Sequence, residues 1–159
     1  MIDIIFAVKF VHVLAAAAMF GTWLAIVLFM VLANRSANTS VVALTSQFVV
    51  RVEMIVMIAA IAVPPISGFP LAAIIGVSSD DDFWIVLSLA LYGLVVLAWL
   101  IEVRLEVRIR NMTREASLAS TPLPDAYRRL FRIWLVLALP ILASMIGLFL
   151  LMVWQPRLE

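Results

Sequence analysis

The sequence predicts an all-α integral membrane protein, a single four-helix bundle over residues 1–159 with up-down antiparallel topology. Hydrophobic residues make up 66% of the chain and charged residues 13%, whereas a soluble domain carries about 25% charged residues. The mean hydropathy is +1.19. Four apolar stretches have the length of about 20 residues that crosses a bilayer core. These observations together indicate a multi-pass membrane protein.

The first span runs over about residues 4–33 and ends at the polar turn 34–38. A secretory signal begins with a basic region, whereas this chain has an acidic residue, Asp3, near its start. The apolar run also continues to Ala33, so we expect a transmembrane helix that is not cleaved off. The second span covers about residues 54–76, preceded by a helical segment at the interface over residues 41–53.

The third span covers about residues 83–101 and continues as a charged helix to Met112. Pro122 and Pro124 predict a loop over residues 115–125. The fourth span covers about residues 133–154 and is ended by Gln155 and Pro156.

The basic residues are sorted to one side of the predicted bundle. Nine of the eleven fall in or beside the first and third connections: Arg35, Arg51, Arg104, Arg108, Arg110, Arg114, Arg128, Arg129 and Arg132. The positive-inside rule therefore places the Arg-rich connection 102–132 in the cytoplasm and both termini outside, in a bacterial inner membrane. This connection is expected to rest on anionic headgroups. No basic patch stands free of the spans, so nucleic-acid binding is not expected.

Helix-breaking residues gather in the second span, at Pro64, Pro65 and Gly68, and Pro140 interrupts the fourth. Such residues are common in membrane helices and favour packing kinks. The alternative is a broken helix that lines a binding site.

His12 is the only histidine, and it lies in the first span. An ionisable group inside a bilayer is costly and marks a candidate functional site. Its ring could ligate a haem iron or another metal, or carry a proton. The alternative is a neutral histidine that only hydrogen-bonds a neighbouring helix. Zero Cys excludes disulfides and thiolate metal sites.

Depth in the bilayer limits the neighbours of His12. Antiparallel helices bring residues 65–68 of the second span, Tyr92 of the third, and Met145 and Met152 of the fourth to its level. Tyr92, Met145 and Met152 are therefore the candidates to complete a cofactor site, although methionines at such positions are often core residues.

A second polar group lies near the cytoplasmic boundary. Glu53 opens the second span and Glu102, Arg104 and Glu106 follow the third, at the same level. Charges at membrane depth normally pair, so we expect a Glu53–Arg104 ion pair, with a proton relay as the alternative. No known catalytic motif appears, so whether the chain is an enzyme stays open.

These residues resemble a family of predicted bacterial four-span integral membrane proteins, DUF2269. The likeness covers nearly the whole chain and rests on residues 9–14, 19–22, Glu53, 65–68, 87–92, 108–110, 123–124, Tyr127, 132–134, Pro140 and 151–153. The chain departs from the family pattern at Ile101 and Arg104, where we expect Pro and Trp.

The segment from Lys9 to Leu14 is also similar, more distantly, to the first helix of HemJ-type protoporphyrinogen oxidases and CopD-type copper-resistance proteins. In the HemJ type the matching histidine binds haem b, so the resemblance implies that His12 is a haem ligand. A lysine of the third helix supports that site, and the third span here has none.

Two classes of function follow from the sequence. The first is a redox protein that binds haem b through His12. The second is a non-enzymatic transporter of a metal or small solute, or an accessory or structural membrane subunit. A bundle of four spans is small, which suggests a homodimer.

Overall fold

The computed structural model describes residues 2–76 and 83–155, and in these ranges the chain is helical except for short connections. The helices are α1 (Ile2–Arg35), α2 (Thr39–Val52), the π-helical segment η1 (Glu53–Met57), α3 (Ile58–Ile75), α4 (Phe83–Leu118) and α5 (Asp125–Trp154). The predicted all-α fold is confirmed. Four of the described helical stretches are long and apolar enough to cross a membrane, because α2, η1 and α3 form one stretch.

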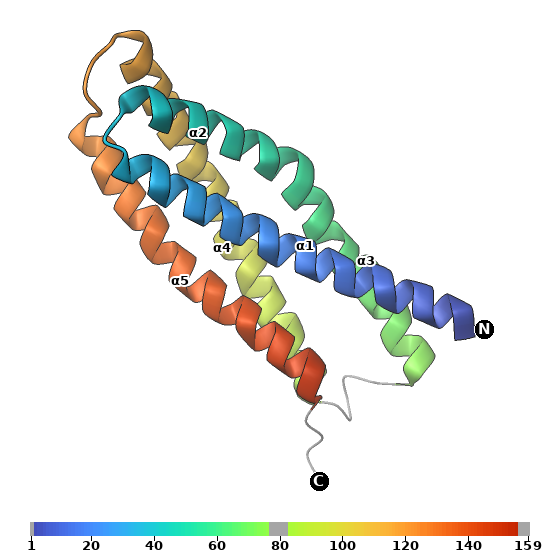
Figure 1. Cartoon of the computed structure of the whole chain (residues 1–159). Helices are drawn as coiled ribbons and strands as arrows, with labels where there is room; N and C mark the ends of the chain where they lie inside the picture. The colour runs from blue at the N-terminus through green and yellow to red at the C-terminus, as the bar shows by residue number, and fades with distance from the viewer. Residues whose placement is uncertain (1, 77–82, 156–159) are drawn as a thin grey trace.

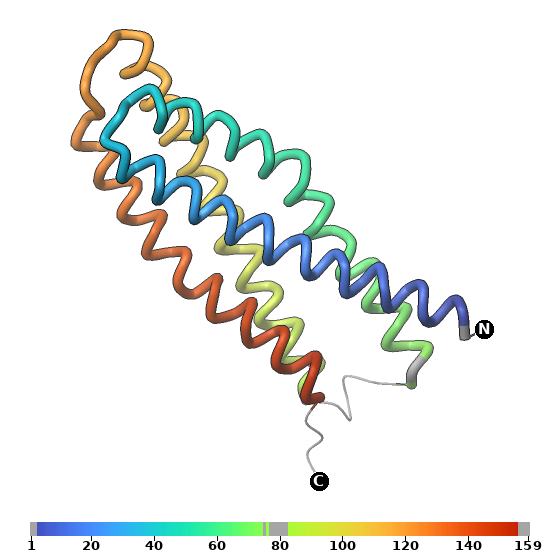
Figure 2. The backbone as a smooth tube through the Cα atoms, viewed as in Figure 1, coloured from blue at the N-terminus to red at the C-terminus, as the bar shows by residue number. Residues whose placement is uncertain are grey.

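The helices run antiparallel in sequence order and form an elongated bundle (Figure 1). α4 packs mainly against α2 and α5, and α1 packs mainly against α3. The connections at residues 36–38 and 119–124 lie together at one end of the bundle, while α1 begins and α5 ends at the other (Figure 2). Toward that second end, the α1–α3 pair diverges from the α4–α5 pair (Figure 2).

The helices extend well beyond the predicted spans. α4 has 36 residues, about 54 Å at 1.5 Å per residue, whereas the hydrocarbon core is ~30 Å thick. The helical segment expected over residues 41–53 is present as α2, and α5 begins at Asp125 rather than 133. The loop expected over residues 115–125 shrinks to 119–124, because Ala116 still packs in the core as part of α4. Most of the Arg-rich connection 102–132 is therefore helical.

Local signals explain where the helices start and stop. Asn38 caps α2, and its side-chain oxygen accepts hydrogen bonds from the backbone N–H groups of Ser40 and Val41. Gly76 ends α3 in the left-handed conformation, with φ of 71°. Pro64, Pro65 and Pro70 all lie inside α3, which continues through them, and Pro140 lies inside α5. The broken helix considered for the second span is thus not formed.

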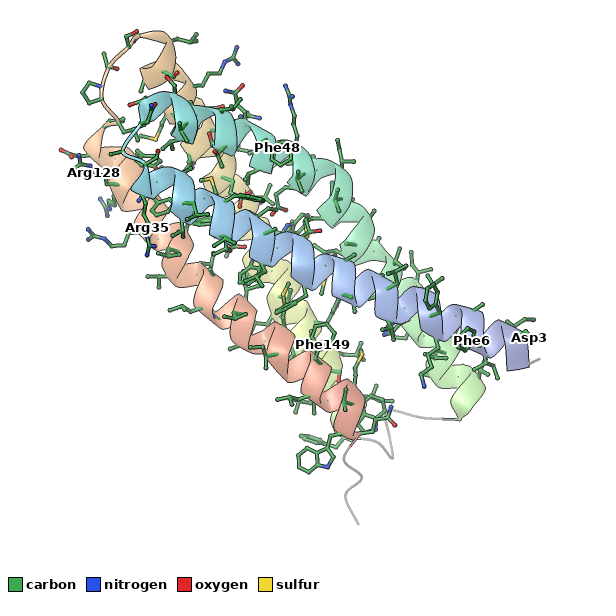
Figure 3. The ribbon with its side chains drawn as sticks, viewed as in Figure 1. Asp3, Phe6, Arg35, Phe48, Arg128 and Phe149 are labelled. Carbon is green, nitrogen blue, oxygen red and sulfur yellow. The ribbon has the colours of Figure 1, made fainter. Side chains whose placement is uncertain are left out.

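The core is a stripe of buried side chains along each helix. On α1 the stripe includes Met19, Trp23, Ile26 and Met30, and the spacing of three to four residues keeps them on one face. Outward positions such as Phe6 and Phe48 are large, apolar and exposed (Figure 3), as expected for helices that face lipid. Arg35 and Arg128 lie at the end with the short connections and Asp3 at the opposite end (Figure 3), which matches the predicted sorting of charge along the bundle.

Candidate functional site

His12 is buried between α1 and α3, with 8% of its surface exposed. Its Nδ1 atom lies 3.0 Å from the Ser67 hydroxyl oxygen. That hydroxyl has one proton, and its shorter contact, 2.7 Å, is donation to the Val63 carbonyl oxygen. The Ser67 oxygen then accepts from Nδ1–H of His12. This arrangement leaves Nε2 as the nitrogen with the free lone pair, which is the form that ligates metals or accepts protons.

Gly68 makes room for the His12 ring. A Cβ atom placed on Gly68 would lie 3.0 Å from Cε1 and 3.5 Å from Nδ1 of His12, and contacts of 3.0 Å are closer than packed carbon atoms normally approach. The glycine at this position is therefore needed for the close approach of α1 and α3. The sequence prediction that residues 65–68 lie level with His12 is confirmed by the Ser67 contact.

Tyr92 bonds α3 near its prolines. Pro65 has no N–H, so it leaves the carbonyl of Ile61, four residues earlier, without its helical partner. The Tyr92 hydroxyl on α4 donates a hydrogen bond to this Ile61 carbonyl oxygen. Membrane helices tolerate proline when a neighbour satisfies the freed carbonyl in this way. The Tyr92 proton is thus already used in holding α4 to α3.

A partly open cavity of about 220 Å³ lies beside His12, where the two helix pairs diverge. It is lined mainly by apolar groups, with Lys9 and Gln155 among the polar ones; the lining includes Lys9, His12, Pro64, Gly68, Trp84, Tyr92 and Met152. A smaller adjoining cavity of about 40 Å³ is lined by His12, Tyr92, Met145 and Met152 together. The structure therefore brings the four predicted cofactor-site residues to one place.

The two methionines differ in their accessibility. Met145 is fully packed in the core, whereas Met152 is about a third exposed. Among residues 2–76 and 83–155, no three His, Asp or Glu side chains lie close enough together to hold a metal ion. His12 is thus the one imidazole donor at this cavity, with sulfur and phenol groups beside it.

A second buried polar cluster involves Glu53, but with other partners than predicted. Glu53 is fully buried and its Oε2 accepts a 2.5 Å hydrogen bond from Nε1 of Trp99. Arg104 is exposed. The Glu53–Arg104 ion pair expected from the sequence is not formed, because Arg104 follows Glu102 by two residues and points to the opposite side of α4.

The sequence reasoning missed three tryptophan donors. Trp23 Nε1 donates to Glu102 at 2.9 Å, Trp134 Nε1 donates to Glu106 at 3.0 Å, and Trp99 donates to Glu53. An available signal was the helical phase, since Glu102 and Glu106 are four residues apart and share one face of α4. That face is the buried one, so its carboxyl groups required donors from other helices.

The fold and these two buried polar sites define a four-helix membrane bundle with an internal histidine cavity. Residues 6–156 match the sequence model of the DUF2269 family, which is described as a predicted integral membrane protein. The chain belongs to this family. No curated protein and no solved structure matches the chain.

Proposed function

We propose that this integral membrane protein binds haem b in the cavity between its two helix pairs, with Nε2 of His12 as the ligand to the iron. The observation that carries the proposal is the 3.0 Å contact between Nδ1 of His12 and the Ser67 hydroxyl oxygen, which suits the tautomer with its proton on Nδ1. The contact holds the ring, and in this tautomer Nε2 keeps its lone pair, as in most histidines that ligate metals. When bound, haem would supply one-electron chemistry.

The other groups at the cavity suit the parts of a haem. The apolar lining suits the porphyrin ring. Lys9 lines the same cavity and is exposed, so its ammonium group is available to a propionate. The 220 Å³ cavity is smaller than a porphyrin, so a haem would also need the open side of the cavity. The resemblance of residues 9–14 to a haem-binding first helix supports the same ligand.

The test is an absorption spectrum of protein purified from haem-supplemented cells, oxidised and then reduced with dithionite. We expect a Soret band that shifts on reduction and is lost in His12→Ala. Phe10→Ala is the matched control, because Phe10 lies on the same turn of α1 and is exposed. A colourless wild-type protein that is folded by circular dichroism would refute the proposal.

The alternative function is non-enzymatic carriage of a small solute through the same cavity. The hydrogen bond from Tyr92 to Ile61 favours it, because it is the contact at the proline kink that would open if α3 separated from α4. This alternative predicts solute uptake into proteoliposomes that Tyr92→Phe changes while the absorption spectrum stays featureless. Haem binding instead predicts a Soret band and no solute uptake that Tyr92→Phe changes.

We further propose that the protein resides in the bacterial inner membrane with its Arg-rich end in the cytoplasm. Six arginines of α4 and α5 toward this end are exposed: Arg104, Arg108, Arg114, Arg128, Arg129 and Arg132. Exposed cations at this level suit anionic headgroups. Replacing Arg128, Arg129 and Arg132 by Gln should reduce the anionic lipid that copurifies in detergent. The homodimer stays a prediction, which light scattering on the purified protein would check.

A further inference from the structure

Three glutamates are fully buried together in the half of the bundle away from His12. Glu53, Glu102 and Glu106 are 0%, 0% and 2% exposed. Glu53 begins the π-helical segment η1 and is bonded by Trp99 of α4, and the other two lie on α4. The three carboxyl groups are near one another because Trp99, which bonds Glu53, lies one turn before Glu102 on α4, and Glu106 lies one turn after it.

Each carboxyl group has one hydrogen bond and one oxygen without a partner. The bonded oxygens accept from the indole N–H groups of Trp99, Trp23 and Trp134, which come from α4, α1 and α5. The other oxygens, Oε1 of Glu53, Oε1 of Glu102 and Oε2 of Glu106, are buried and have no hydrogen-bond partner in the part of the chain that the structure describes. Buried polar atoms in proteins nearly always have partners, so three unpartnered oxygens in one cluster need an explanation.

Within residues 2–76 and 83–155, the surrounding helices supply no cation to this cluster. The basic residues at this level point away and are exposed: Arg51 of α2, Arg104 and Arg108 of α4, and Arg132 of α5. Arg110 is half-buried and bonds Asn111. Arg128 and Arg129 of α5 are also exposed, and the buried Tyr127 of α5 donates its hydroxyl proton to Asn34. On α1, Lys9, His12 and Arg35 each lie 11 or more residues from Trp23, at least about 16 Å along the helix.

A proton is the ion that fits these three oxygens. Isolated carboxylates buried without a cation are very costly. A metal ion needs several ligands at fixed short distances, and the described residues contain no such group of acidic side chains. A proton needs only one oxygen, and the O–H group that it forms can donate a hydrogen bond.

We propose that Glu53, Glu102 and Glu106 form a proton-binding centre in the bundle core that exchanges protons with the aqueous side. In each step a proton adds to the unpartnered oxygen of one carboxylate, and release reverses the step, while the tryptophan hydrogen bond to the second oxygen is kept. The centre is separate from the His12 cavity and does not depend on what binds there.

The aqueous side is expected to be the end with the short connections. The same faces of α2 and α4 continue to a buried hydroxyl pair, in which Ser46 and Thr113 lie 2.8 Å apart. Beyond it, the Ser117 hydroxyl donates to Ser40 at the end of the bundle. Val49 and Ile109 lie between the hydroxyl pair and the carboxyl groups, and both are fully buried. Proton exchange should therefore be slow compared with that of an exposed glutamate.

The test is infrared spectroscopy of the full chain in lipid nanodiscs. At neutral pH we expect the C=O stretching band of a protonated carboxylic acid, which moves to lower frequency after transfer to D₂O and disappears at alkaline pH. Glu53→Gln, Glu102→Gln and Glu106→Gln should each remove part of this band. Glu115→Gln is the matched control, because Glu115 is exposed on the same helix, and it should leave the band unchanged.

The wild-type protein decides the question even if a glutamine variant does not fold. Absence of the acid band at neutral pH would overturn the proposal, as would a band that does not respond to D₂O or to alkaline pH. Loss of the band on adding Na⁺, Ca²⁺ or Zn²⁺ at constant pH would also overturn it, in favour of a metal-ion site. The haem spectrum and this band are independent, so either proposal can fail while the other holds.

Discussion

Replacing Gly68 by Ala tests the construction of the His12 site directly. The new Cβ atom would lie 3.0 Å from Cε1 of His12, so the ring must move by a few tenths of an ångström. Its Nδ1 atom is bonded to Ser67 at 3.0 Å, and the movement both stretches this bond and pushes the ring off its rotamer. Loss of the hydrogen bond costs about 0.5–1.5 kcal/mol, and rotamer strain costs a further ~0.5–1.5 kcal/mol.

A matched glycine separates this effect from helix propensity. Gly93 is also inside a helix, but a Cβ atom there has nothing within 4 Å. Gly93→Ala should therefore stabilise the protein by up to ~1 kcal/mol, the usual advantage of Ala over Gly in a helix. Gly68→Ala gains the same amount and loses about 1–3 kcal/mol at His12. We expect its free energy of unfolding to lie about 1–3 kcal/mol below that of Gly93→Ala.

The assay is unfolding by sodium dodecyl sulfate in mixed micelles, followed by circular dichroism, for both alanine variants. Equal free energies of unfolding would refute the reasoning, because they would mean that His12 does not pack on Gly68. The double variant Gly68→Ala with His12→Ala provides an internal check. Since the ring is gone, the added methyl group should no longer destabilise the protein.

Three further predictions concern the remaining contacts. Trp99→Phe removes the donor to Glu53 and should lower the free energy of unfolding by about 1–3 kcal/mol, measured by the same titration. Tyr92→Phe leaves the Ile61 carbonyl without its donor and should cost ~0.6–1.7 kcal/mol, the scale of hydrogen bonds between membrane helices. Because the chain has no Cys, Ser120→Cys in the exposed connection should react with a membrane-impermeant maleimide in inverted vesicles but not in intact cells.

Each of these predictions has a contrary outcome. Trp154→Phe is the control for the first, since Trp154 is 78% exposed, and equal stability of the two Trp variants would contradict a role for the Trp99 hydrogen bond. An unchanged free energy of unfolding for Tyr92→Phe would show that the kink does not need the hydroxyl. Labelling of Ser120→Cys in intact cells would reverse the assigned orientation.

Much of the fold was readable from the sequence because bilayer thickness and hydropathy constrain it strongly. The four helices, their antiparallel order and the level of His12 against residues 65–68 all follow from the positions of the apolar stretches. The helix ends did not, because hydropathy marks where lipid ends rather than where the helix ends. α5 begins eight residues before the predicted fourth span, at Asp125, since its buried face packs on α4 outside the apolar window.

The second polar site shows what hydropathy cannot supply. The sequence places Glu53, Arg104 and Glu106 at one level, and opposite charges at one level suggest an ion pair. The helical positions exclude this ion pair. Positions 102 and 106 share a face of the helix, whereas position 104 lies about 200° from 102 at 100° per residue. The tryptophan partners could not be predicted, since they depend on how α1, α4 and α5 are rotated about their axes.

Both buried polar sites lie where the α2–η1–α3 stretch departs from regular α-helix. At η1 the helix widens to a π-turn and Glu53 enters the core beside Trp99. At Pro65 the missing N–H frees a carbonyl, and Tyr92 crosses from α4 to bond it, beside Ser67 and His12. A regular helix would offer no free carbonyl at Pro65, and π-turns occur frequently at functional sites. These two irregularities are therefore part of the candidate sites, and a substitution that restores a regular helix at either point should disturb the adjacent site more than it disturbs the bundle.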